Sequence, residues 1–89
     1  MKKIIFDHSV IEDLTKWTHS DARLVKKVFE LINDIKKHPF EGLGKPEMLK
    51  RDFKGCWSRR ITHEHRLIYK VLPDNDIFIL SVHGHYEGL

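Results

Sequence analysis

The sequence predicts an α+β domain in which two N-terminal helices pack on a mainly antiparallel, twisted sheet. Three observations carry this prediction. Apolar residues recur at helical spacing before Pro39, they alternate with polar residues after Met48, and loop-forming residues separate the two parts. A short β-rich run precedes the helices, so the predicted order of elements is β-α-α-β-β-β.

The first strand is predicted over residues 3–6, where two isoleucines and a phenylalanine follow one another. A helix follows directly. Ser9 is its candidate N-cap, and Glu12 stands three residues later at the position of a capping-box partner. The side of this helix that we expect to be buried is marked by Val10, Leu14 and Trp17.

A longer second helix is predicted to begin after the candidate N-cap Ser20 and to end before Pro39. Lys36 and Lys37 suit the negative end of its dipole. Its expected buried stripe consists of Ala22, Val25, Val28, Phe29, Ile32 and Ile35. The two helices are therefore expected to form an αα-hairpin.

Three strands are predicted in the second half of the chain, over residues 56–62, 66–72 and 77–82. The Pro-Asp-Asn-Asp sequence of residues 73–76 predicts a turn between the last two strands. Two prolines and two glycines in residues 39–46 predict a loop between the helices and these strands.

Length and composition predict a single globular domain over residues 1–89, with 40% hydrophobic and 33% charged residues. Cys56 is the only cysteine, so an intramolecular disulfide is excluded. The apolar run near the N-terminus ends at Asp7, too early for an export signal, and no other stretch is long enough to span a bilayer. We therefore expect a cytoplasmic protein with no membrane association.

Basic residues gather between positions 45 and 66, where seven cations outnumber three carboxylates, in a chain of net charge +3. The cations are Lys45, Lys50, Arg51, Lys54, Arg59, Arg60 and Arg66. Arginine suits planar recognition of phosphate, so this segment indicates a polyanionic partner. An acidic protein partner is the alternative.

Two His-x-His pairs raise the alternative of a zinc site, because residues two apart on a strand share a face. The pairs are His63 with His65 and His83 with His85. No spaced set of cysteines or carboxylates accompanies them, so we expect independent histidines near strand ends and no metal. Cys56 is expected to be a small packed thiol and not a nucleophile.

The remaining polar residues supply an acid–base set with cationic support: Glu47, Arg59, Arg60, Arg66, His85 and Tyr86. Cleavage of RNA without a metal needs a base for the 2′-hydroxyl and an acid for the departing 5′-oxygen. It also needs cationic donors for the charge that develops on phosphorus. The chain has a candidate for each of these roles.

The same residues resemble the YoeB toxins, which belong to the wider RelE-like group of bacterial toxin–antitoxin systems. The resemblance lies in Gly44-Lys45-Pro46-Glu47, Leu49-Lys50, Trp57-Ser58-Arg59-Arg60-Ile61-Thr62, Glu64-His65-Arg66-Leu67 with Tyr69, and His85-Tyr86. It also includes Val25-Lys26-Lys27 and His38-Pro39-Phe40-Glu41-Gly42, and so spans nearly the whole chain. The chain departs from the family pattern at His83-Gly84, where the family has a bulkier pair, and in its extension Glu87-Gly88-Leu89.

The resemblance implies a RelE/ParE-like fold and a ribosome-dependent mRNA endonuclease, without a cofactor, that a YefM-like antitoxin neutralises. It implies that Glu47 is the general base, Arg66 the phosphate stabiliser and His85 the general acid. Tyr86 would position the substrate, and Lys50 and Arg60 would bind RNA. The charge pattern alone adds Arg59 to this RNA-binding set.

The expected reaction is an in-line transesterification that leaves a 2′,3′-cyclic phosphate and that is slow on free RNA. One alternative is a RelE/ParE-like toxin that inhibits a protein target without cutting RNA. Another is a module that binds metal or RNA without catalysis. Whether the free toxin is a monomer or a homodimer is left open, as are the sequence preference of cleavage and the stoichiometry of the toxin–antitoxin complex.

Overall fold

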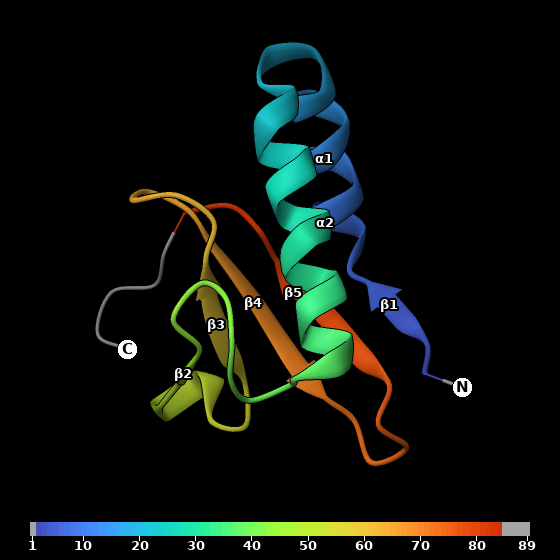
Figure 1. The fold of residues 1–89 in the computed structure, drawn as a ribbon, viewed down its shortest axis with the longest axis vertical. Coiled ribbons are helices and arrows are strands. Elements are labelled where there is room, and N and C mark those ends of the chain that lie inside the picture. Colours follow the sequence, from blue (N-terminus) through green and yellow to red (C-terminus); the bar gives the residue numbers. More distant parts are fainter. Residues whose placement is uncertain (1, 85–89) are drawn as a thin grey trace.

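The computed structural model describes residues 2–84. Within them, two helices pack on one face of a five-stranded sheet whose strands lie in the order β1-β5-β4-β3-β2 (Figure 1). The elements are β1 (Ile4–Phe6), α1 (His8–Ser20), α2 (Ala22–Lys37), β2 (Glu47–Met48), a short 3-10 helix (Arg51–Phe53), β3 (Trp57–Arg60), β4 (Arg66–Val71) and β5 (Ile77–Ser81). The predicted α+β class is confirmed.

The sheet is mainly antiparallel, as predicted: β2 pairs with β3, β3 with β4 and β4 with β5 in this sense. Only β1 runs parallel to its neighbour, with Ile4 opposite Ile77. The strand β2 is a difference from the predicted order. It has two residues, too few to produce a recognisable alternation in the sequence.

The main core lies between the helices and the sheet, and it corrects part of the predicted stripe of α2. Val28, Ile32 and Ile35 are buried as expected, but Phe29 is 46% exposed and Ala22 is exposed as well. Leu31, which was not predicted, is fully buried. At about 100° per residue, positions 28, 31, 32 and 35 form one narrow stripe, and Phe29 lies beside it.

The helix N-caps also differ from the prediction. Asp7, not Ser9, caps α1: its carboxylate accepts hydrogen bonds from the Ser9 backbone N–H (3.0 Å) and hydroxyl (2.7 Å). These bonds lower the pKa of Asp7. Asp21, not Ser20, caps α2 by accepting from the backbone N–H of Arg23. In both cases the neighbouring aspartate takes the capping position, so each serine lies inside α1.

A second, smaller cluster lies on the other face of the sheet. Leu49, Cys56 and Ile68 are buried there, with Phe53 and Leu80 packed against them. Cys56 is therefore the packed thiol that was expected, and burial raises its pKa. This cluster seats the segment after β2 on the sheet.

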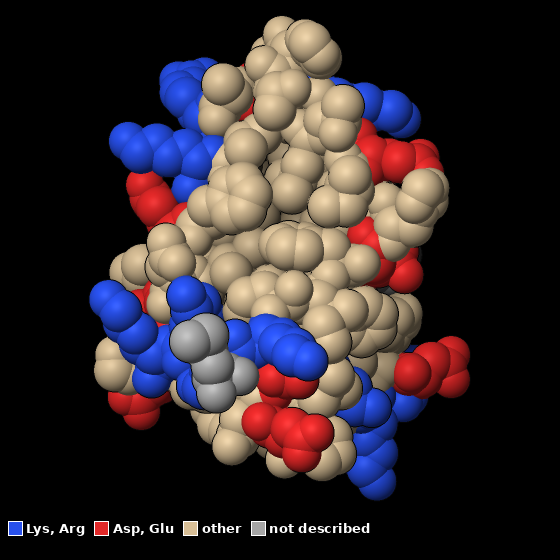
Figure 2. Space-filling view, turned by 90° about the vertical axis from the view of Figure 1, so that its right-hand side faces the viewer, with Lys and Arg blue, Asp and Glu red and all other residues tan. Residues whose placement is uncertain are grey.

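On the side of the molecule on which α1 and β1 lie, the upper and central part is largely uncharged, and charged residues lie at its margins and across its lower part (Figure 2). The exposed apolar residues Ile5 and Ile11 belong to these two elements. Neither of the described helices is long and apolar enough to cross a membrane.

Candidate functional site

The strand register brings three of the predicted site residues to one face of the sheet. Glu47 on β2 is opposite Ser58 on β3, and Arg60 at the end of β3 is opposite Arg66 at the start of β4. Directly opposed residues share a face, and so do residues two apart on a strand. Glu47, Arg60 and Arg66 therefore lie on the face that the helices do not cover.

The guanidinium of Arg66 is oriented by the loop between β3 and β4. Its Nη1 atom donates to the backbone carbonyls of Thr62 (3.2 Å) and His63 (3.3 Å), and the carbonyl of His65 lies 3.5 Å away. Arg66 is half-buried, whereas its partner Arg60 is exposed. The structure thus holds one arginine in a defined direction and leaves the other open to solvent.

Glu47 and Lys50 are both exposed, and both lie at the β2 edge of the sheet. Lys50 comes directly before the 3-10 helix, two residues after the end of β2. His85 and Tyr86, the predicted general acid and substrate-positioning residue, lie outside the described residues. The described part of the site is therefore a carboxylate and cations on an open sheet face.

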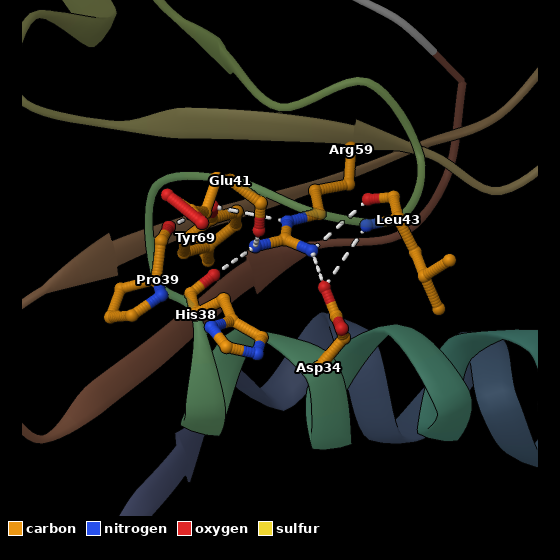
Figure 3. Close-up of polar contacts among 7 residues, drawn as sticks. All are labelled: Asp34, His38, Pro39, Glu41, Leu43, Arg59 and Tyr69. Atoms are coloured by element: carbon orange, nitrogen blue, oxygen red, sulfur yellow. Dashed lines mark hydrogen bonds and ion pairs between the residues drawn. The ribbon is translucent and has the colours of Figure 1, made fainter.

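Arg59 is not available to bind RNA, which corrects the prediction made from its charge. Its side chain is fully buried and points towards α2 (Figure 3). It pairs with the carboxylate of Asp34 and donates to the hydroxyl of Tyr69 at 3.3 Å. Its remaining N–H groups donate to the carbonyls of His38, Glu41 and Leu43.

The Arg59 network fixes the loop that leads from α2 to Glu47. The Tyr69 hydroxyl adds a bond to the carbonyl of Pro39, and the Asp34 carboxylate accepts from the backbone N–H of Leu43 at 3.0 Å. The hydrogen bond from Arg59 is the main reason that the pKa of Asp34 is lowered, and burial raises the pKa of Tyr69. Arg59 is thus an internal support of the site.

A signal for the burial of Arg59 was present in the sequence. Trp57, Arg59 and Ile61 alternate with Ser58 and Arg60, so the period of two already places Arg59 on the apolar face of its strand. The acceptors could not be found in this way. Three of the five are backbone carbonyls, of His38, Glu41 and Leu43, whose positions depend on the path of the chain after α2.

The histidines do not form a cluster of metal ligands in residues 2–84, where no three His, Cys, Asp or Glu side chains come together in a group able to hold an ion. His65 and His83 are neighbours, with ring centroids 5.2 Å apart, while His63 is exposed. His85 belongs to the part of the chain outside the description.

Two hollows of the surface lie away from the site. One is lined by residues of α2 and the loop after β3, including Arg23, Lys27 and Thr62, and the other by α2 residues and Leu43. Glu47, Arg60 and Arg66 line neither of them. An open face with basic residues suits an extended polyanion better than a small enclosed molecule.

Comparison with known proteins agrees with this fold. A solved structure of a YoeB–YefM complex from Staphylococcus aureus contains a chain that matches with a TM-score of 0.86 and 42% identity, over 97% of this chain and 99% of the other. The fold and the open basic sheet face thus define one of the small α+β toxins of bacterial toxin–antitoxin systems.

The family follows from the sequence comparisons. Residues 6–86 match the family of YoeB-like toxins of bacterial type II toxin–antitoxin systems, and the chain belongs to this family. Toxin YoeB of Escherichia coli K12 is 48% identical over 84 residues, which are 94% of this chain and 99% of the relative. A solved YoeB dimer from Staphylococcus aureus matches with a TM-score of 0.87 and 43% identity, over 96% and 98% of the two chains.

Proposed function

We propose that this toxin is a ribosome-dependent mRNA endonuclease that cleaves by acid–base transesterification with its own side chains. The observation that carries the proposal is the shared sheet face of Glu47, Arg60 and Arg66. It offers a carboxylate and two cations to an extended RNA strand, while the buried cation Arg59 serves the fold.

In the proposed reaction, the Glu47 carboxylate accepts the proton of the 2′-hydroxyl. The 2′-oxygen then attacks phosphorus, and the bond to the 5′-oxygen breaks as His85 donates a proton to that oxygen. Arg66, oriented by the carbonyls of Thr62 and His63, stabilises the charge that develops on the phosphate. Tyr86 positions the substrate, and Lys50 and Arg60 hold the RNA backbone. The products are a 2′,3′-cyclic phosphate and a free 5′-hydroxyl.

Dependence on the ribosome is supported by the exposure of Glu47. A solvent-exposed carboxylate on a two-residue edge strand does little to hold a flexible RNA in line for attack. A partner that fixes the mRNA strand against this face supplies the missing orientation, and correct orientation contributes large factors to rate. A cytoplasmic location follows from this proposed target.

The central test is Glu47→Gln, with Glu41→Gln as a matched control on another exposed glutamate in the preceding loop. Loss of a general base lowers the cleavage rate by roughly 10²–10⁴-fold. We expect this loss for Glu47→Gln on ribosome-bound mRNA, with unchanged ribosome binding and wild-type cleavage by Glu41→Gln. End mapping should find a cyclic phosphate.

Wild-type cleavage by Glu47→Gln would refute the proposed role of this residue. A wild-type protein that arrests growth without cutting translated mRNA would refute the nuclease function and favour inhibition of a protein target.

We further propose that a YefM-like antitoxin neutralises the toxin and that two toxin copies can associate, as the solved Staphylococcus aureus complex and dimer suggest by analogy. An acidic segment that folds over the basic sheet face would block access to Glu47 and Arg66. Co-expression with the adjacent operon product should yield a stable complex without cleavage activity. A complex that still cleaves at the full rate would argue against neutralisation.

A further inference from the structure

Two adjacent residues of the hairpin between β3 and β4 hold the backbone of Gly84 from both sides. The Gly84 N–H donates to Nδ1 of His65 at 2.8 Å, and the Gly84 carbonyl accepts from the Arg66 backbone N–H, also at 2.8 Å. Gly84 has φ +67°, in the left-handed region that favours glycine. The chain therefore leaves β5 along a defined path up to the residue before His85.

The His65 ring that accepts this bond is itself firmly placed. It lies between Trp17 of α1 and His83, each with its ring centroid 5.2 Å away, and its side chain is only 14% exposed. The His65 backbone is fixed as well, because its N–H donates to the Thr62 hydroxyl at 3.1 Å and its carbonyl accepts from Ile61 at 3.0 Å. A packed ring on a fixed backbone is a stable acceptor.

The bond from Gly84 uses Nδ1 of His65 as its acceptor, and a ring nitrogen can accept a hydrogen bond only where it carries no proton. A carboxylate oxygen of Glu64 lies 3.9 Å from Nε2 of the ring, and the His83 ring is a close neighbour. From α1 the ring contacts the uncharged Trp17.

We propose that His65 is a positioning residue for the cleavage reaction: through Gly84 it sets the approach of the chain to His85. This inference rests on the proposed nuclease function. Gly84 is bonded at once to His65 and to the backbone of Arg66, so the path towards the general acid is tied to the residue that stabilises the phosphate.

The test compares two substitutions of His65, one that keeps an aromatic ring and one that keeps a hydrogen-bond acceptor. His65→Phe keeps an aromatic ring between Trp17 and His83 but removes the acceptor. His65→Asn loses the ring but keeps a side-chain oxygen close to the position of Nδ1. His63→Phe is the matched control, because His63 is an exposed histidine in the same loop.

Displacement of a catalytic group by about 1 Å can lower a rate by roughly 100-fold. We expect a loss of kcat of this order for His65→Phe on ribosome-bound mRNA, with KM and ribosome binding within about twofold of wild type. His65→Asn should recover most of kcat, and His63→Phe should match wild type. Equal kcat for His65→Phe and wild type, or equal losses in the Phe and Asn variants, would overturn the inference.

A second measurement separates this inference from the proposed function. The amide proton of Gly84, observed by NMR, should be protected from hydrogen exchange in the wild type and should lose this protection in His65→Phe but not in His63→Phe. An unprotected Gly84 amide in the wild type would refute the bond itself. If the wild type cuts no RNA, the nuclease proposal and the catalytic role of His65 fail together, while the amide measurement still decides whether His65 holds Gly84.

Discussion

Arg59 shows how one side chain can be misjudged from its charge and still matter to the site. The structure uses all of its donors inside the fold, on Asp34, Tyr69 and the carbonyls of residues 38, 41 and 43. Its neighbour Arg60 is exposed on the opposite face of the same strand. Two consecutive arginines therefore have separate tasks, the first in the fold and the second in the proposed RNA contact.

This division gives a stability prediction. Arg59→Met should lower the free energy of unfolding by about 3–5 kcal/mol, because it leaves a partly buried carboxylate and several carbonyls without their donor. Arg60→Met, on the exposed side, should change it by no more than about 0.5 kcal/mol. Urea denaturation followed by circular dichroism measures both values. Similar values for the two variants would mean that the Arg59 network contributes little.

At the scale of elements, the aspartates before the two helices define where each helix begins. Asp21 serves both helices: its backbone N–H donates to the Trp17 carbonyl at the end of α1, and its carboxylate accepts from Arg23 at the start of α2. Asp21 is therefore the only residue between the two helices of the αα-hairpin.

Replacement of this cap should be costly, and replacement of the serine beside it should not. Asp21→Ala removes a capping carboxylate and should destabilise the fold by about 1 kcal/mol. Ser20→Ala removes only a hydroxyl that donates back to the Lys16 carbonyl within α1, and its effect should stay within about 0.5 kcal/mol. Thermal unfolding of the two variants measures both losses of stability. A larger loss in Ser20→Ala than in Asp21→Ala would contradict the assignment of Asp21 as the cap.

The elements that could be predicted from the sequence are the helices with several turns and the strands long enough for apolar and polar residues to alternate. The two helices and β3, β4 and β5 all appear where the apolar periodicity placed them, with ends that differ by a few residues. β2 could not be predicted, because its two residues become a strand only by pairing with Trp57 and Ser58. The N-caps were misassigned because an aspartate lies within two residues of each predicted serine, and both residue types favour that position.

The candidate site was predictable in its residue types and only partly in its arrangement. Glu47, Arg60 and Arg66 share a face, a relation set by pairing between strands and not by spacing along the chain. Arg59 could have been excluded from the alternation of its strand. The contact of His65 with Gly84 joins residues 19 apart through a side-chain nitrogen, and no pattern of residue types predicts such a contact.

At the scale of the whole molecule, two aspartates make the fold sensitive to acid. Hydrogen bonds from Ser9 lower the pKa of Asp7, and the Arg59 guanidinium lowers that of Asp34. The unfolded chain, with pKa values near 3.8, therefore takes up protons before the folded chain does. The stabilisation is complete above this value and is lost as pH falls through the lower pKa values of the folded state.

We therefore expect the free energy of unfolding to fall as the pH is lowered from about 5 to 2. Asp34→Asn should be less stable than wild type at pH 7, and its stability should change less over the acid range, because one of the two linked carboxylates is gone. Urea titrations at several pH values measure this slope. An acid slope as steep in Asp34→Asn as in wild type would contradict the assignment to Asp34.

The parallel pairing of β1 with β5 has a consequence for synthesis of the toxin. The Lys3 N–H donates to the Asp76 carboxylate, 73 residues away, and β5 lies between β1 and β4 in the sheet. A nascent chain cannot close this sheet until β5 has left the ribosome, and contacts between such distant residues form slowly. Gly84 comes three residues after the end of β5, so its bonds to His65 and Arg66 form only after that step. A toxin proposed to act on ribosomes thus completes its fold late in its own translation.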